Sequence, residues 1–384
     1  MWIFWVAVSW GDTETRLRTW IQEIWHRHPS IEANKSRIEE RISSMQSIEQ
    51  WKEPYVSLSV APLGLGYSVV LRQPYLYPQE YRLQKERASL QLEESKRRLN
   101  ESKEMLQKEF LTHLVDWMYA QKKFELSMQH RSLIMAHKKS VQGRIEVGAI
   151  PKAVLAQLES ELADLELLQI GYQSSIRVHQ LRLEELLGRS WKENLSLHPP
   201  PSLPQTRGKA SFLLQPKIAQ KDAQILGKLH ETNKRPPLFF SMGHSNMMME
   251  QDKWWTMGFG LEIPINQRQK QARIQESLWQ EKRHKWEEKA LLDTWKSKVE
   301  AEEELVRGLL AQRDIIQNKT HPTVERECST MGVAFEAGQV SIDALLRAEH
   351  KRVRILDHDA QLVKHLWYSY AKLLYWYGIT LEDL

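Results

Sequence analysis

The chain has 384 residues, 27% of them charged, with only 16 glycines and 15 prolines, a composition typical of long helices. Its net charge of +5 comes from interspersed acidic and basic side chains, which indicates solvated helix faces and argues against nucleic-acid binding. The single cysteine, Cys328, excludes an intramolecular disulfide and a cysteine-based zinc cluster.

The chain begins with the apolar segment MWIFWVAVSWGD, residues 1–12, which lacks a basic start and is too short for a transmembrane helix. We expect it to be a truncated signal segment, with any lipidation cysteine in the missing part. Residues 13–196 are predicted to form the first of two repeats. Near its start, His26 and His28 are two residues apart where a helix should begin, and residues with this spacing do not share a helix face. A metal-binding pair is therefore not favoured there.

The first repeat contains a predicted β-hairpin at residues 55–75, because apolar residues alternate with serines in YVSLSV. From residue 77 to 146 the sequence has only one proline and one glycine, so it predicts a helix of about 70 residues, about 100 Å long at 1.5 Å per residue. Gly148 then predicts a chain reversal, because glycine tolerates positive φ. Residues 150–188 form the predicted return helix.

A proline-rich linker, residues 197–208, leads into the second predicted repeat, residues 209–384. That repeat again starts with a helix, followed by a β-hairpin at 238–265, a long helix at 267–336 and a return helix at 341–378. Pro322 should kink the long helix near its end. Three landmark pairs, each separated by 190 residues, indicate a tandem duplication: Pro74 and Pro264, Gly148 and Gly338, and Gly188 and Gly378.

Four strands per chain cannot close a membrane β-barrel, which starts at eight strands, so several chains would have to contribute. The repeated order of proline-ended hairpin, long helix, VGAI or AGQV turn and return helix resembles the TolC family of outer-membrane efflux proteins, over about Glu14 to Gly378. The expected fold is mainly α with a small β part, built from tandem-duplicated helical hairpins.

This resemblance implies a homotrimer whose hairpins share a transmembrane β-barrel in the outer membrane and whose helices form a periplasmic α-barrel. It implies the exit duct of a tripartite efflux or secretion system, working with a periplasmic membrane-fusion adaptor and an inner-membrane pump. One branch of the family serves heavy-metal efflux, so the resemblance implies that small molecules or metal ions pass through the duct. The transported substrate, the partner pump and the gating mechanism stay open.

The resemblance also implies two sites on the helices. The turns at the periplasmic tip would contact the adaptor, at Gly148, Ala149, Ile150 and Pro151 and at Gly338, Gln339, Val340 and Ser341. Family members carry acidic residues six and nine positions beyond the second turn glycine, where this chain has Ala344 and Arg347, with Asp343 one position earlier. Arg347 would then form a basic constriction, in place of an acidic one. The alternative, that Arg347 is a surface residue or forms a salt bridge between chains, stays open.

The second hairpin is rich in methionine and tryptophan. His244, Met247, Met248 and Met249 offer soft ligands, but a tight metal site at an external hairpin tip would hinder release. A transient metal contact is thus the lesser alternative. Trp254, Trp255 and Phe259 are better explained as an aromatic belt facing outer-membrane lipid.

The sequence carries no motif that indicates an enzyme or a cofactor: it lacks GxSxG, P-loop and HExxH patterns. The acidic run VEAEEEL is typical of a solvated helix face. Two other classes remain open, a soluble coiled-coil scaffold and a periplasmic adaptor. The adaptor is disfavoured because it should have one helical hairpin on a β-rich module, whereas this chain has two equivalent repeats.

Overall fold

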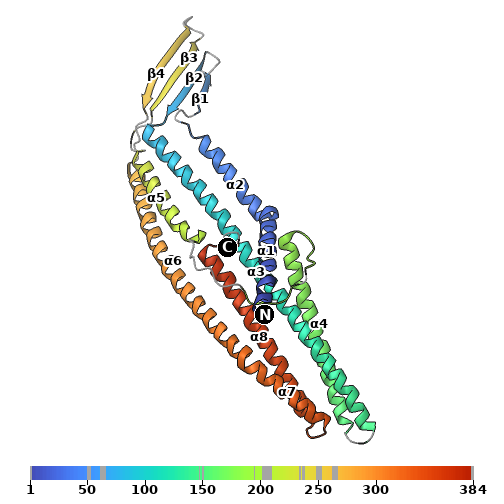
Figure 1. Ribbon diagram of the computed structural model, residues 1–384. Helices are drawn as coiled ribbons and strands as arrows, with labels where there is room; N and C mark the ends of the chain where they lie inside the picture. Colours follow the sequence, from blue (N-terminus) through green and yellow to red (C-terminus); the bar gives the residue numbers. More distant parts are fainter. Residues whose placement is uncertain are drawn as a thin grey trace. The chain divides into compact units, whose positions relative to one another are not determined.

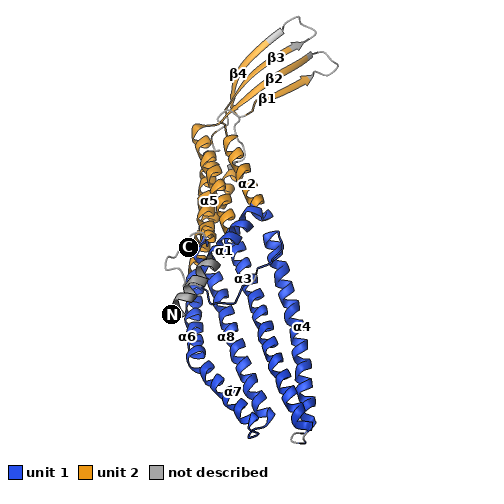
Figure 2. Cartoon of the chain, turned by 45° about the vertical axis from the view of Figure 1, so that its right-hand side comes forward, with its two compact units in different colours: residues 1–31, 102–210, 295–384 blue, residues 32–101, 211–294 orange. Residues whose placement is uncertain are grey.

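The computed structural model describes residues 2–49, 53–60, 66–146, 148, 151–193, 195–200, 210–232, 235, 238–247, 253–261 and 267–381. The chain divides into two compact units, shown in Figure 2. Unit 1 comprises residues 1–31, 102–210 and 295–384, and unit 2 comprises residues 32–101 and 211–294. Each unit therefore takes segments from both predicted repeats.

The described part of the first half consists of these helices and strands (Figure 1): α1 Trp2–Arg27, α2 Pro29–Gln46, β1 Tyr55–Val60, β2 Gly66–Tyr75, α3 Pro78–Glu146 and α4 Ala153–Leu187. The predicted first helix is two helices. Pro29 starts α2, where a missing N–H costs nothing. His26 thus lies in the last turn of α1 and His28 between the helices, so the prediction that both lie at a helix start is wrong.

The second half repeats this order: a 3₁₀ turn Ser211–Leu214, α5 Gln215–Thr232, β3 Leu238–Met247, β4 Lys253–Leu261, α6 Gln267–Ile315, a π-helical turn Ile316–Thr320, α7 His321–Glu336 and α8 Ile342–Tyr377. All four described glycines with positive φ belong to the landmark pairs: Gly148, Gly188, Gly338 and Gly378. The mainly α, duplicated fold is confirmed.

The long helix of the second half is interrupted near Pro322. In the π-helical turn the N–H of His321 donates to the carbonyl of Ile316, five residues back. Proline has no N–H to continue the regular ladder, and an added residue in one turn absorbs the misfit. The chain changes direction between α6 and α7 (Figure 2), as the predicted kink requires.

An aromatic core holds unit 1 together. The Trp191 ring, which follows α4, packs edge-on against Trp20 of α1 at a centroid distance of 4.9 Å and against Trp117 of α3 at 5.5 Å. Gln107 of α3 binds the C-terminal segment, because its amide donates to the carbonyl of Ile379 and accepts from the N–H of Leu381. These contacts bury the segment that follows α8 together with the helices of unit 1.

Unit 2 combines a sheet with parts of four helices. Leu83 and Leu90 of α3 pack on Ile225 and Leu229 of α5. The strands form one antiparallel sheet in the order β1-β2-β3-β4, so the two hairpins join through the β2–β3 pair (Figure 1).

Candidate functional site

The sheet has one apolar face. Antiparallel partners such as Met242 and Met257, or Leu71 and Met242, lie on the same face, and residues two apart share it. The register therefore collects thirteen apolar or aromatic residues on this face, together with His244 and the polar Gln73: Val56, Leu58, Tyr67, Val69, Leu71, Tyr75, Leu238, Phe240, Met242, Trp255, Met257, Phe259 and Leu261.

The apolar face is exposed within one chain. Phe259 is 91% exposed, Met257 71% and Trp255 66%, although exposing apolar side chains to water costs free energy. Soluble monomers rarely expose a contiguous apolar face that spans several strands. The face therefore requires either lipid or another protein surface.

The opposite face is mostly small and polar. Ser59 and Ser68 share a hydrogen bond of 2.7 Å across the first hairpin, and Ser241 donates to the carbonyl of Gly258 across the second. Phe239 is an exception, but its ring covers Gly260, where a Cβ would lie 2.1 Å from it. Apolar-out and polar-in alternation of this kind is typical of strands that enclose an aqueous lumen.

Of the four predicted soft-metal ligands, only His244 has a described side chain. His244 lies on the apolar face between two aromatic rings, with centroids 4.7 Å from Trp255 and 6.1 Å from Tyr67. Met248 and Met249 lie outside the described residues, as do the side chains of Met247 and Trp254. The geometry of His244 is that of an aromatic contact.

Two chain reversals, α3–α4 and α7–α8, belong to unit 1 (Figure 2). Gly148 and Gly338 have φ of 75° and 73°, a left-handed conformation that glycine adopts without steric cost. In the second reversal the N–H of Gly338 donates to the carbonyl of Phe335 and that of Gln339 to the carbonyl of Ala334. This pair of bonds is the Schellman cap, which satisfies carbonyls left free at the end of α7.

Most predicted tip residues are exposed. Gly148, Pro151, Gly338, Gln339 and Ser341 face solvent, and Ala149 and Ile150 lie outside the described residues. Val340 is half-buried and packs on a core cluster of the turns that includes Leu158, Phe335 and Leu345. Val340 thus holds the turn, and its described neighbours are open to solvent.

Arg144 connects the two reversals. From the last turn of α3, its guanidinium donates to the carbonyls of Phe335 (3.0 Å) and Glu336 (3.1 Å) at the end of α7. The same group lies 4.7 Å from the centroid of the Phe335 ring. One cation therefore binds the negative end of the α7 dipole and an aromatic face together.

The predicted constriction residues lie in the first turns of α8. Ser341 caps the helix by accepting from the N–H of Ala344, Asp343 is exposed and Ala344 is half-buried. Arg347 is exposed, and its Nε donates to the carbonyl of Asp343 at 3.2 Å. Within the described part of the chain Arg347 forms no ion pair, so its positive charge is available to solvent or to another chain.

Unit 1 contains two histidine–carboxylate clusters that the sequence did not predict. His113, Asp116 and His179 form one, and His130, Glu161 and His350 the other. Within each cluster the possible ligand atoms lie within 4.8 Å of one another. His113 and Asp116 lie three residues apart on α3, but His179 comes from α4, and the other cluster draws on three helices. No local spacing in the sequence therefore marks either complete cluster.

No helix in the described part of the chain combines the length and apolar character needed to cross a membrane. No protein-family model and no curated protein matches the sequence. Solved structures match its fold. CusC, studied for transmembrane channel formation, is 14% identical to this chain with a TM-score of 0.81. The match covers 95% of this chain and 92% of the CusC chain.

Two further structures are similar over nearly the same length. The outer membrane protein VceC from Vibrio cholerae is 11% identical with a TM-score of 0.81, covering 96% of this chain and 97% of its own. The outer membrane channel CmeC of Campylobacter jejuni is 12% identical with a TM-score of 0.79, covering 94% and 85%. The chain therefore shares its fold with these proteins over 94% to 96% of its length.

Proposed function

We propose that this chain, which has the fold of the TolC-type outer-membrane channels, is the outer-membrane exit duct of a tripartite export system. The observation that carries the proposal is the exposed apolar face of the sheet, opposite a face that is mostly small and polar. A strand with lipid on one side and water on the other needs this pattern. The proposed localisation is the outer membrane, with the helices in the periplasm.

The proposed assembly is a homotrimer. Within one chain the sheet is open, with β1 and β4 at its edges. Unpaired edge groups are costly in lipid, so these strands should pair with those of other copies. Three copies would supply twelve strands, within the range of closed outer-membrane barrels.

The two alternative functions are less well supported. A soluble scaffold would leave the apolar face in water, at a cost of about 25 cal/mol for each Å². An adaptor should have a single helical hairpin, whereas this chain matches channel structures over 94% to 96% of its length.

The matched variants Met257→Lys and Thr256→Lys test the proposed membrane sheet. The two residues are adjacent in β4 but lie on opposite faces. A lysine on the lipid face costs about 2–4 kcal/mol at the bilayer midplane, so Met257→Lys should reduce the amount of heat-stable oligomer extracted from outer membranes. Thr256→Lys should assemble and change ion selectivity in planar bilayers. Equal assembly of both variants, or a soluble non-conducting wild type, would contradict the exit-duct proposal.

We further propose that Arg347 from each copy lines the periplasmic entrance. Its support is an exposed guanidinium held by the carbonyl of Asp343 and free of a carboxylate within the described chain. A ring of fixed positive charge should favour anions. Single-channel reversal potentials should therefore shift toward cations in Arg347→Ala and further in Arg347→Glu, while Arg347→Lys stays near wild type. Unchanged selectivity in Arg347→Ala would rule out this placement.

The exposed turn residues are the proposed contact with a periplasmic adaptor. Gln339 and Pro151 project from the two reversals that Arg144 connects. A photo-crosslinker at Gln339 should capture a periplasmic helical protein in intact cells, whereas the same group at exposed Gln361 of α8 should not. Equal capture from both positions would count against a specific tip contact.

A further inference from the structure

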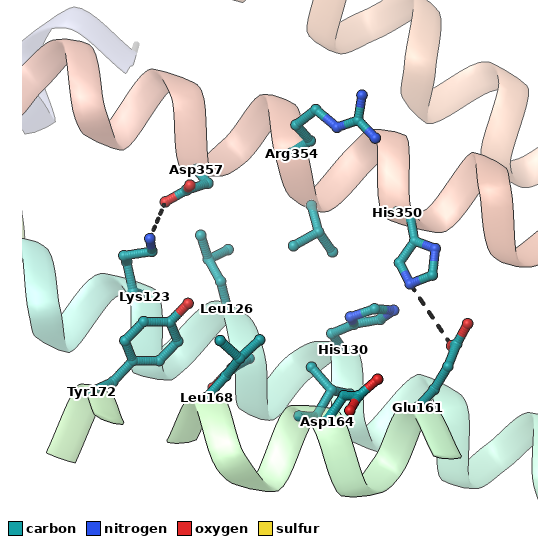
Figure 3. A pocket seen from close by; sticks show the side chains of 13 residues that line it. Lys123, Leu126, His130, Glu161, Asp164, Leu168, Tyr172, His350, Arg354 and Asp357 are labelled. Atoms are coloured by element: carbon teal, nitrogen blue, oxygen red, sulfur yellow. Dashed lines mark ion pairs between the residues drawn. The ribbon is translucent and has the colours of Figure 1, made fainter. Parts of the chain in front are cut away.

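Three helices of unit 1 bring two imidazoles and a carboxylate together beside a cavity of about 460 Å³ (Figure 3). His130 comes from α3, Glu161 from α4 and His350 from α8. The rings of His130 and His350 meet edge-on with centroids 5.0 Å apart, and Nε2 of His350 lies 3.7 Å from Oε2 of Glu161. Figure 3 shows the three side chains converging from different helices.

These ligand atoms are poorly satisfied by the protein. His130 is only 4% exposed, and its Nε2 has no hydrogen-bond partner in the described part of the chain. The same holds for the buried Oε2 of Glu161. A buried polar atom without a partner is destabilising, so a group that fills the space between these atoms would relieve that cost.

The surrounding charges suit a cation. Asp164 lines the same cavity as Glu161 and adds a further carboxylate to it. Two basic groups near the cluster face carboxylates of their own: Lys123 pairs with Asp357 at 3.6 Å, and Arg352, whose positive charge acts on His130, lies 3.7 Å from Glu325. Arg354 is exposed and extends away from the three ligands (Figure 3).

We propose that His130, Glu161 and His350 form a binding site for a divalent transition-metal ion of the zinc class. Two imidazoles and one carboxylate are a ligand set that zinc accepts, with a water completing four-coordination. Ligand atoms around tetrahedral zinc lie about 3.4 Å apart, given bonds of about 2.0–2.2 Å. The atoms here lie within 4.8 Å, so small side-chain rotations close the site.

The second cluster is a natural comparison that lacks this potential. Asp116 is already bound by the ammonium of Lys364 at 2.7 Å and by the hydroxyl of Tyr368. A fixed positive charge on the only carboxylate opposes metal binding to His113 and His179. The metal is therefore assigned to the first cluster alone.

A bound ion would link the α3–α4 hairpin to α8. Its ligands lie on three helices, so it would oppose any separation of α8 from the other two within unit 1. Metal ions that bind only the folded arrangement stabilise it by mass action. This inference does not depend on transport, because it concerns binding to the folded chain.

Calorimetric titration of Zn²⁺ into the metal-stripped, purified full-length protein tests the site. We expect one Zn²⁺ per chain in the wild type. His350→Ala and Glu161→Gln should each weaken binding by more than about 100-fold, since losing an outer-shell partner alone costs 10–100-fold. His350 is half-exposed, so its truncation should leave folding intact. The matched control, His179→Ala, removes a histidine from the comparison cluster and should leave the affinity unchanged.

X-ray absorption of the zinc-bound wild type gives an independent measurement. It should show two imidazole nitrogens at about 2.0–2.1 Å, and one after His350→Ala. Zinc that binds equally to wild type and His350→Ala, or a wild type with no stoichiometric zinc, would overturn the proposal. Loss of binding in His179→Ala with retention in His350→Ala would also overturn it, by assigning the metal to the comparison cluster.

Discussion

Arg144 should determine whether the two helical reversals of unit 1 behave as one body. Its guanidinium donates to two carbonyls at the end of α7 and stacks on Phe335, so Arg144→Ala removes every contact at once. Arg144→Lys keeps the charge but loses the planar fork that reaches both carbonyls. The two variants therefore separate charge from hydrogen-bond geometry.

The expected effect follows from two charge-assisted hydrogen bonds of about 1.5–3 kcal/mol each. The bond to Glu336 is exposed and the one to Phe335 only partly buried, so water replaces much of both in the variant. After this discount, Arg144→Ala should destabilise the α7–α8 reversal by about 1–3 kcal/mol. Because about 1.4 kcal/mol is tenfold, local opening should become about 5- to 150-fold more frequent.

Hydrogen exchange of peptides covering residues 334–345, followed by mass spectrometry, measures this opening. The N–H groups of Gly338 and Gln339 report on it directly, since both bond to carbonyls of α7. Arg182→Ala is a suitable control, because that arginine is exposed and pairs only one turn away with Glu185. Exchange in Arg144→Ala that equals the control would refute the idea that Arg144 couples the reversals.

Three further predictions concern stability, measured as the free energy of unfolding in denaturant. Gly338→Ala should cost about 1–2 kcal/mol because the φ of Gly338 is 73°. Gly332→Ala, inside α7 with open space where the new Cβ would lie, should instead stabilise the protein by about 0.5–1 kcal/mol. Equal effects of the two variants would contradict the turn geometry. Leu158→Ala should cost about 2–5 kcal/mol, since the side chain is fully buried in the turn core, and a cost under 1 kcal/mol would mean that this core is not packed. Burial lowers the pKa of His198 below its usual 6.5, and the charges of Arg313 and Lys122 lower it further. The neutral His198 side chain therefore contributes to the free energy of unfolding above pH 6.5, and this contribution is lost as the pH falls through the folded-state pKa. Acidification should therefore destabilise the wild type more than His198→Gln, and parallel pH profiles would contradict this.

The sequence predicted the elements of this fold because their signals are local. Alternation in β4 marks the apolar face that includes Met257 and Phe259, and the scarcity of breakers marks α3. Gly148 and Gly338 signal their own reversals, since a positive φ is a property of one residue. Repetition at a fixed offset then indicated the duplication. Pro322 predicted a kink, although the π-helical turn that produces it depends on how neighbouring turns absorb the missing N–H.

Tertiary structure alone decided which distant residues meet. Pairing of β2 with β3 joins hairpins from the two halves, and the units cut across both repeats. Arg144 reaches Phe335, and His130 meets Glu161 and His350, without any spacing in the sequence that records it. Sequence periodicity fixes which face of a helix or strand a side chain occupies, because that depends on the backbone repeat. Which faces then meet depends on the axial register between helices, which packing of the whole core sets at once.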